Sequence, residues 1–268
     1  MNCTLLKTLL LVFMLSFNAL QAAALDQNHT AFSVVLAKHV RWNSLGTASS
    51  VDYAGLAASR AGLDAYTQTL SSVTAAELQS YSKLQRRAFL INAYNAFTLQ
   101  LILTQYPKLK SIKELGSVFR SPWKKAFIRL LGKEVSLDDI EQTMIRGAAD
   151  FDDPRIHFAV NCASIGCPAL RPEAFTAAKL DAQLLDQTQR FLRDRSRNAY
   201  QAGTGVLMLS SIFDWYGDDF AKSSKSLSGF LSNYAGSLGL NAAQLAKLKS
   251  EQLEIDFFDY EWSLNVTR

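Results

Sequence analysis

"YSKLQRRAFLINAYNAFTLQLILTQYP", residues 81–107, is the stretch that sets the helical half of the fold. Its apolar residues recur at three- and four-residue steps, which predicts a long helix that ends before Pro107. Asn92 and Asn95 lie three residues apart on this otherwise apolar helix, so each needs hydrogen-bond partners if it is buried. Two interpretations follow: the amides tie down neighbouring loops, or they shape a polar pocket that binds a substrate.

Helices are also predicted on the N-terminal side of this stretch, over most of residues 26–80, where "HTAFSVVLAKHVRW" places Phe32, Val35, Leu36 and Val40 near one face. On the C-terminal side, "SPWKKAFIRLLGKEVSLDDIEQTMIR" (121–146) predicts a hairpin around Gly132 and then a helix. Ser136 and Asp139 have the spacing of a capping box at the start of that helix.

Strands are predicted from β-branched and aromatic content in three later segments, with helices between them. The predicted strands are "RIHFAVN" (155–161), "TGVLMLSSIFDWY" (204–216, with a turn near Ser210) and "LEIDFFDYEW" (253–262), and the predicted helices are 179–195 and 226–239. Because helices and strands do not strictly alternate, the predicted class is α+β. We expect a helical N-terminal part packed on a small, mostly antiparallel sheet, with a cysteine-containing turn at a strand end.

The N-terminal segment has the features of a secretory signal peptide. Residues 1–24 contain one lysine, an apolar run from Leu9 to Phe17 and three small residues at Ala22–Ala24. Cleavage is predicted after Ala24 or Ala22, which leaves residues 25–268 as a single globular domain. The apolar run is short for a membrane span of roughly 20 residues, so no stable span is expected after removal of the signal. The predicted location is periplasmic or secreted.

Composition limits the partners that the chain can have. The formal net charge of +4 is too small to indicate nucleic-acid binding. With 49% hydrophobic residues the chain can bury a large core, and no low-complexity linker divides it. The expected partner is a small molecule or a peptide, and no cofactor is indicated.

The stretch "HFAVNCASIGCPAL" (157–170) holds the two cysteines that remain after signal cleavage. If Cys162 lies at a strand end, free backbone N–H groups there would stabilise its thiolate form and make it reactive. Alternatively, five residues of curled chain bring Cys162 and Cys167 within the roughly 4.4–6.8 Å between Cα atoms that a disulfide needs. Inert buried thiols are a third interpretation. The spacing is neither C-x-x-C nor a four-ligand zinc pattern, so no metal site is predicted, although His157 could converge with both cysteines.

His157 is the only histidine near these cysteines, and a Cys/His pair is a common thiol-activating device. On an extended strand His157 and Cys162 lie roughly 16 Å apart and point to opposite faces, so pairing requires a sharp turn near Asn161. Glu141 lies one turn inside the helix predicted after Ser136. It either faces inward, where it could orient a histidine or an arginine, or lies on a solvated face.

Five stretches together resemble the domain of unknown function 547 family, over roughly Phe32 to Asn265. They are "RRAFLINAYNAFTLQLIL", "SPWKKAFIRLLGKEVSLDDIEQTMIR", "DPRIHFAVNCASIGCPALRPEAF", "LSSIFDWYGDDF" and "DYEWSLN". The positions that match the motif of that family are Asn92, Tyr94, Asn95, Trp123, Asp139, Glu141, Asp153, Pro154, Arg155, His157, Asn161, Cys162, Cys167, Pro168 and Trp262. One departure is Gln142, where many members of the family carry a histidine. The resemblance implies no activity, because the family is named for the absence of an assigned function.

Two hypotheses of function follow. The first is a cysteine-dependent hydrolase or acyl or thiol transferase with a papain-like arrangement, in which Cys162 is the nucleophile, His157 the base and Glu141 the orienting carboxylate. Its substrate-binding candidates are Asn92, Asn95, Asn161 and Arg155, although an internal ion pair is the simpler role for Arg155. The second is a non-catalytic periplasmic binding or envelope-interaction module in which a Cys162–Cys167 disulfide holds a loop.

Overall fold

Helix α5 (Lys83–Leu103) is the long helix at the centre of the computed structural model, which describes residues 25–117 and 121–267. Ser82 and Gln85 form a reciprocal capping box at its start, and it ends before Pro107, as predicted. From Ala88 to Leu103 nearly every residue is buried, so this helix is covered on all sides. The predicted signal peptide, residues 1–24, lies outside the described residues.

The elements outside α5 are short. The other α-helices are α1 (Thr30–His39), α2 (Tyr53–Ala58), α3 (Ala61–Ser72), α4 (Ala75–Ser80), α6 (Leu180–Arg193), α7 (Ile212–Trp215), α8 (Gly217–Ser224), α9 (Leu227–Ser232), α10 (Ala235–Leu238) and α11 (Ala242–Lys249). Three 3₁₀ turns, η1 (Ile112–Leu115), η2 (Pro122–Lys124) and η4 (Pro154–Phe158), and one π-helix, η3 (Asp139–Arg146), are also present in the described part. The strands are β1 (Val40–Trp42), β2 (Ser49–Val51), β3 (Ile128–Leu130), β4 (Lys133–Val135), β5 (Ala199–Gln201), β6 (Val206–Ser210) and β7 (Ile255–Phe258).

The α+β class is confirmed, and the strands form three small sheets. The pairs β1–β2, β3–β4 and β5–β6 are antiparallel, whereas β6 and β7 are parallel. The predicted hairpin is β3–β4, which turns at Leu131 and Gly132 with φ of 53° and 78°. Positive φ at two consecutive residues is typical of a type I′ turn, and glycine adopts it without steric cost. The helix predicted after it is η3, where the backbone N–H and the hydroxyl of Ser136 both donate to Asp139.

The prediction of a strand over residues 155–161 is wrong. The segment forms the 3₁₀ turn η4, because Asp153 caps it by accepting from the backbone N–H of Arg155, and Pro154 occupies its first turn. These helix-start signals outweigh the β-forming side chains that follow them. The loop that contains both cysteines, residues 161–168, therefore follows a helical turn and not a strand end. It is called the cysteine loop below. A smaller correction concerns Val40, which begins strand β1 instead of continuing α1.

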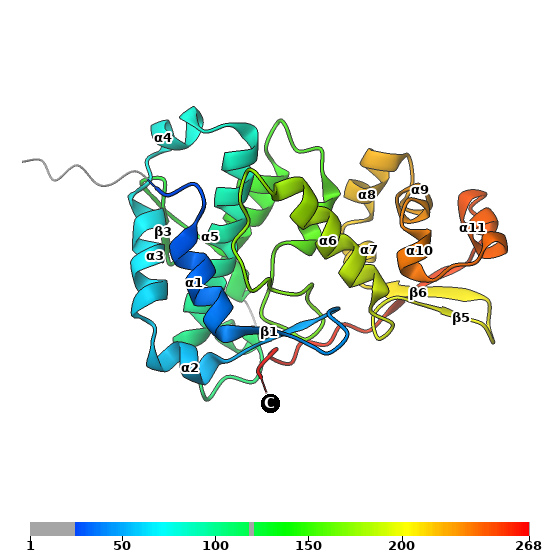
Figure 1. Cartoon of the computed structure of the whole chain (residues 1–268), viewed down its shortest axis with the longest axis horizontal. Coiled ribbons are helices and arrows are strands. Elements are labelled where there is room, and N and C mark those ends of the chain that lie inside the picture. The colour runs from blue at the N-terminus through cyan, green and yellow to red at the C-terminus, as the bar shows by residue number, and fades with distance from the viewer. Residues whose placement is uncertain (1–24, 118–120, 268) are drawn as a thin grey trace, which may run out of the picture.

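Two hydrophobic clusters meet at η4. The larger cluster surrounds α5 and includes Ile156, whereas the smaller one lies among α6 to α11 and includes Phe158. His157 is thus held between the two cores. In Figure 1 the N-terminal helices (blue and cyan) lie on one side and α8 to α11 (orange) on the other, with α6 between them.

The C-terminal segment after β7 runs back across both halves. In Figure 1 it is the red strand of chain that passes from the side of α11 to an end near β1. Val266 pairs with Val51 and Leu264 pairs with Ser164, so the segment is held against the N-terminal hairpin and against the cysteine loop. Among the described residues, none of the helices combines the length and apolar character needed to cross a bilayer.

Candidate functional site

A pocket of about 220 Å³ opens where η3, η4, the cysteine loop and the C-terminal segment meet. Its volume is below the roughly 300–1,000 Å³ of drug-sized ligand sites, so it suits a small ligand. The described residues that line it are Tyr94, Ser121, Trp123, Asp138, Glu141, Gln142, His157, Val160, Cys162, Cys167, Pro168, Ile212, Trp215, Tyr216, Tyr260 and Trp262. The pocket therefore brings together Glu141, His157 and Cys162, the residues predicted for the first hypothesis, and Cys167 lies beside them.

Glu141 is buried, with 8% of its surface exposed, and its partners are tyrosines. Tyr216 donates its hydroxyl to Oε1 of Glu141 at 2.6 Å, and Tyr94 also hydrogen-bonds this carboxylate. Burial and the nearby negative charge of Glu141 raise the pKa of Tyr216, so its hydroxyl stays a donor at neutral pH. Glu141 faces inward, but its hydrogen bond goes to Tyr216 and not to His157.

His157 is paired with a carboxylate that the sequence interpretation did not identify. Its Nε2 lies 2.8 Å from Oδ2 of Asp219 in α8, and because a carboxylate only accepts, Nε2 carries the proton. Arg146 donates to the same oxygen at 2.6 Å. Burial would raise the pKa of Asp219, but the hydrogen bonds from His157 and Arg146 outweigh it and lower that pKa. The imidazole also stacks on Tyr216, with ring centroids 3.9 Å apart.

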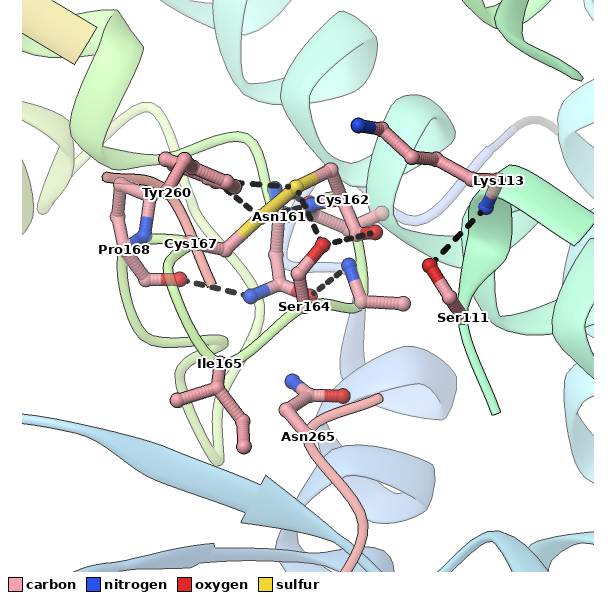
Figure 2. Close-up of a disulfide and its surroundings, with 12 residues drawn as sticks. Ser111, Lys113, Asn161, Cys162, Ser164, Ile165, Cys167, Pro168, Tyr260 and Asn265 are labelled. Atoms are coloured by element: carbon pink, nitrogen blue, oxygen red, sulfur yellow. Dashed lines mark hydrogen bonds between the residues drawn. A yellow bond between two sulfur atoms is a disulfide. The ribbon is translucent and has the colours of Figure 1, made fainter. Parts of the chain in front are cut away.

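Cys162 and Cys167 are joined in a disulfide with their Cα atoms 6.0 Å apart, as the second hypothesis predicts. Figure 2 shows the bridge beside the ring of Tyr260, whose hydroxyl lies 3.3 Å from the sulfur of Cys162 and 3.2 Å from that of Cys167. The backbone N–H of Cys162 also donates to Sγ of Cys167 at 2.9 Å. A sulfur in a disulfide is no nucleophile, so thiol chemistry at Cys162 requires prior reduction.

One wall of the pocket is aromatic. Tyr260 and Trp262 come from the C-terminal segment, with ring centroids 4.4 Å apart, and Trp215 from α7 stacks on Trp262 at 5.8 Å. Trp123 meets the edge of Trp262 at 5.7 Å. The ammonium group of Lys113 lies 4.0 Å from the centre of the Trp262 ring, so this cluster already holds one cation at its rim.

The asparagine side chains predicted to bind a substrate form hydrogen bonds with the main chain instead. Asn92 donates to the carbonyl of Phe175 and accepts from its N–H, at 2.7 and 2.9 Å. Asn95 joins the carbonyl of Ala159 to the N–H of Asn161 in the same way, at 2.9 and 2.8 Å. None of the three predicted substrate-binding asparagines, Asn92, Asn95 and Asn161, is among the residues that line the pocket. Their geometry matches the loop-fastening interpretation.

Asn161 fixes the cysteine loop from inside. Its side chain donates to the carbonyl of Pro168 at 2.7 Å and accepts from the N–H of Ala163 at 2.9 Å (Figure 2). Arg155 is ion-paired with Asp153 and Asp181, at 2.8 and 2.7 Å, and is not part of the pocket lining. Within the described part of the chain no group of three His, Cys, Asp or Glu side chains is placed to hold a metal ion.

Sequence reasoning missed Asp219 and the function of the aromatic residues. Asp219 stands in "GDDF" beside the exposed Asp218, and nothing local distinguishes the two. Tyr216, Tyr260 and Trp262 lie in segments with strand-like spacing, which favoured a core role. One signal was available: all three residues lie in stretches that resemble the domain of unknown function 547 family, which would have indicated a role beyond packing.

A family model described as "Protein of unknown function, DUF547" matches residues 78–192, which include α5, η3, η4, the cysteine loop and most of α6. Neither the curated proteins nor the solved structures gave a match. Residues 78–192 of this chain are therefore similar to the DUF547 family of proteins of unknown function, as the motif resemblance predicts.

Proposed function

We propose that this protein is an exported, non-catalytic binding module whose pocket takes a small organic cation, with an ammonium group held between Glu141 and the aromatic wall. The observation that carries the proposal is a buried carboxylate, Glu141, that forms no ion pair among the described residues and lies in a pocket lined by aromatic rings. Export is part of the proposal. It is supported by the signal-like residues 1–24 and by the disulfide, since disulfides persist in oxidising compartments.

The charge in the pocket is negative. Two carboxylates, Asp138 and Glu141, line it, and none of its described lining residues is a lysine or an arginine. Arg146 lies nearby: its guanidinium is paired with Asp219 and lies 4.9 Å from the centre of the Tyr216 ring, where it also feels the charge of Glu141. Among the described residues the hydrogen-bond partners of Glu141 are the neutral hydroxyls of Tyr216 and Tyr94, so its carboxylate keeps an attraction for a cation. An ammonium ligand in the pocket would place a positive charge directly beside Glu141.

The walls suit the same ligand. Rings of Trp and Tyr attract cations through their electron-rich faces, by about 0.5–2 kcal/mol each depending on desolvation. Trp123, Trp215 and Trp262 all contribute to the lining, together with the three tyrosines Tyr94, Tyr216 and Tyr260. Recognition of alkylammonium groups by aromatic cages is the functional use of this chemistry.

The cysteine-dependent hydrolase hypothesis has less support from this geometry. It needs a free thiolate at Cys162, and the sulfur is in a disulfide. It also needs a base, and the Nε2 proton of His157 is held by Asp219. Iodoacetamide labelling of protein purified without reductant separates the two hypotheses. We expect no labelling of either cysteine before reductant is added, whereas fast labelling of Cys162 with a midpoint well below about 8.5 would favour the hydrolase.

The binding proposal is tested with choline and its uncharged isostere 3,3-dimethylbutan-1-ol, followed by tryptophan fluorescence, because three of the four tryptophans line the pocket. We expect choline to bind and to change the fluorescence, and the alcohol to bind at least about tenfold more weakly, since it lacks the charge. Equal affinity for the two compounds, or no binding of choline, would exclude a cation site.

Glu141→Gln is the matched variant, because it removes the charge and keeps an oxygen to accept from Tyr216. We expect it to weaken choline binding about tenfold or more and to leave the binding of the alcohol unchanged. Glu254→Gln removes the same charge from an exposed position and serves as the control. Equal loss in both variants would mean that only the net charge of the protein matters.

A further inference from the structure

We propose that the Cys162–Cys167 disulfide is a thiol–disulfide exchange site for small-molecule thiols, with Cys162 as the sulfur that is attacked and Cys167 as the leaving group. This activity is separate from the binding of a cation in the same pocket. It rests on three features of the described residues: unequal access to the two sulfurs, a backbone N–H that donates to the sulfur of Cys167, and a loop that is fastened without the bridge.

Access to the two cysteines differs. Cys167 is 4% exposed, whereas Cys162 is only partly buried, and both line the pocket. An attacking thiolate must approach a sulfur in line with the S–S bond, so the more open sulfur is the one that reacts. The pocket volume of about 220 Å³ admits a small thiol and excludes a folded protein partner.

The leaving sulfur has hydrogen-bond donors where negative charge would develop. The N–H of Cys162 lies 2.9 Å from Sγ of Cys167, and the hydroxyl of Tyr260 lies 3.2 Å from it (Figure 2). Burial raises the pKa of Tyr260, so the hydroxyl keeps its proton at neutral and mildly alkaline pH. Donors to a thiolate lower its pKa, and a leaving thiol of lower pKa departs faster.

The loop does not depend on the bridge for its shape. The side chain of Asn161 spans the loop from the N–H of Ala163 to the carbonyl of Pro168. The backbone N–H groups of Ile165 and Gly166 donate to the C-terminal segment, each at 2.8 Å. Arg197 donates to the carbonyl of Cys167 and is itself paired with Asp194. After reduction the two sulfurs therefore stay close together, which makes re-oxidation intramolecular and the site reversible.

The exchange balances without any other reagent. A small thiol loses its proton to water, and its thiolate forms a new S–S bond with Sγ of Cys162 as the Cys162–Cys167 bond breaks. The electron pair of that bond stays on Sγ of Cys167, which is released as a thiolate. A second thiol molecule then attacks the mixed disulfide, releasing the small disulfide and leaving Cys162 and Cys167 reduced. The small thiol is oxidised and the protein is reduced.

The test is to treat the native protein briefly with 2-mercaptoethanol, trap with iodoacetamide, and locate both modifications by peptide mass spectrometry. We expect the mercaptoethanol adduct on Cys162 and the carbamidomethyl group on Cys167. An even distribution, an adduct mainly on Cys167, or no adduct until urea unfolds the protein would overturn the proposal. Because 2-mercaptoethanol is uncharged, its reaction does not depend on the cation site. The choline titration therefore tests the cation site alone, and the position of the mercaptoethanol adduct tests the exchange site alone.

Tyr260→Phe keeps the ring and removes only the donor to the leaving sulfur. We expect exchange to slow about tenfold, the effect of one hydrogen bond to a developing charge, while the midpoint of urea unfolding changes little. Tyr200→Phe, outside the pocket, is the control.

Cys167→Ser tests the access to Cys162 in a protein that cannot form the disulfide. We expect the unpaired Cys162 of this variant to be alkylated by iodoacetamide in the folded protein. A Cys162 that reacts only in urea would show that the sulfur is inaccessible, and would also overturn the proposal.

Discussion

Phe158→Ala is expected to lower the free energy of unfolding by about 4 kcal/mol, the largest effect predicted for a single substitution in this protein. Phe158 is fully buried and its ring packs against four other phenylalanines, Phe191, Phe213, Phe220 and Phe230. Removing the ring loses its transfer free energy and leaves a cavity among rigid neighbours. The melting temperature should fall by roughly 10 °C in a chain of this size.

Urea unfolding followed by circular dichroism measures the change. Leu185→Ala is the matched control, because Leu185 is 39% exposed on the same helix, α6, that carries Phe191. It should cost less than about 1 kcal/mol. A loss for Phe158→Ala as small as that of the control would mean that the smaller cluster is loosely packed. In that case it could not hold η4, and with it His157, in place.

Asp219→Asn is expected to cost about 3 kcal/mol at neutral pH. Asp219 is 6% exposed and its Oδ2 accepts from both His157 and Arg146. Loss of its charge leaves the guanidinium of Arg146 with no carboxylate at this position, while the amide of asparagine still accepts one hydrogen bond. Asp218→Asn, one residue away and exposed, should change stability by less than about 0.5 kcal/mol.

The cost of Asp219→Asn should depend on pH in a defined direction. The pKa of Asp219 in the folded protein is lower than its ordinary value of 3.8. The charge of Asp219 therefore stabilises the fold fully above that value, and this contribution is lost as the pH falls toward the folded-state pKa. Urea midpoints of the wild type and of Asp219→Asn should differ most above about pH 5 and converge in more acidic solution. A difference that stays constant down to acid pH would mean that packing, and not charge, is lost.

Much of the fold could be predicted from local patterns. The length of α5, its stop before Pro107, the hairpin at Gly132 and the Ser136–Asp139 cap all follow from spacing and from residues whose backbone preferences are strong. The strand predicted for residues 155–161 failed because β-forming composition competed with an Asp-Pro helix start, and the start won. Both are local signals, and the burial of Ile156 and Phe158 in different clusters agrees with the helical turn, because residues two apart on a strand would face the same side.

The candidate site could be predicted only in part. Spacing left three interpretations of Cys162 and Cys167, and the disulfide is one of them. The partner of His157 comes from α8, 62 residues later in the chain. Such a pairing leaves no trace in a single sequence, because any of several acidic residues could have filled the position. The aromatic wall likewise joins residues from η2, α7 and the C-terminal segment.

The sequence by itself determined the α+β class, the position of the main helices and the set of residues from which a site could be built. These depend on interactions within a few residues, which periodicity and capping signals record directly. The tertiary structure decided that Glu141 faces tyrosines, that His157 pairs with Asp219, and that the asparagines hold loops while tryptophans line the pocket. The physical reason is that side-chain pairing between distant segments depends on which surfaces the two hydrophobic clusters bring together as they are buried.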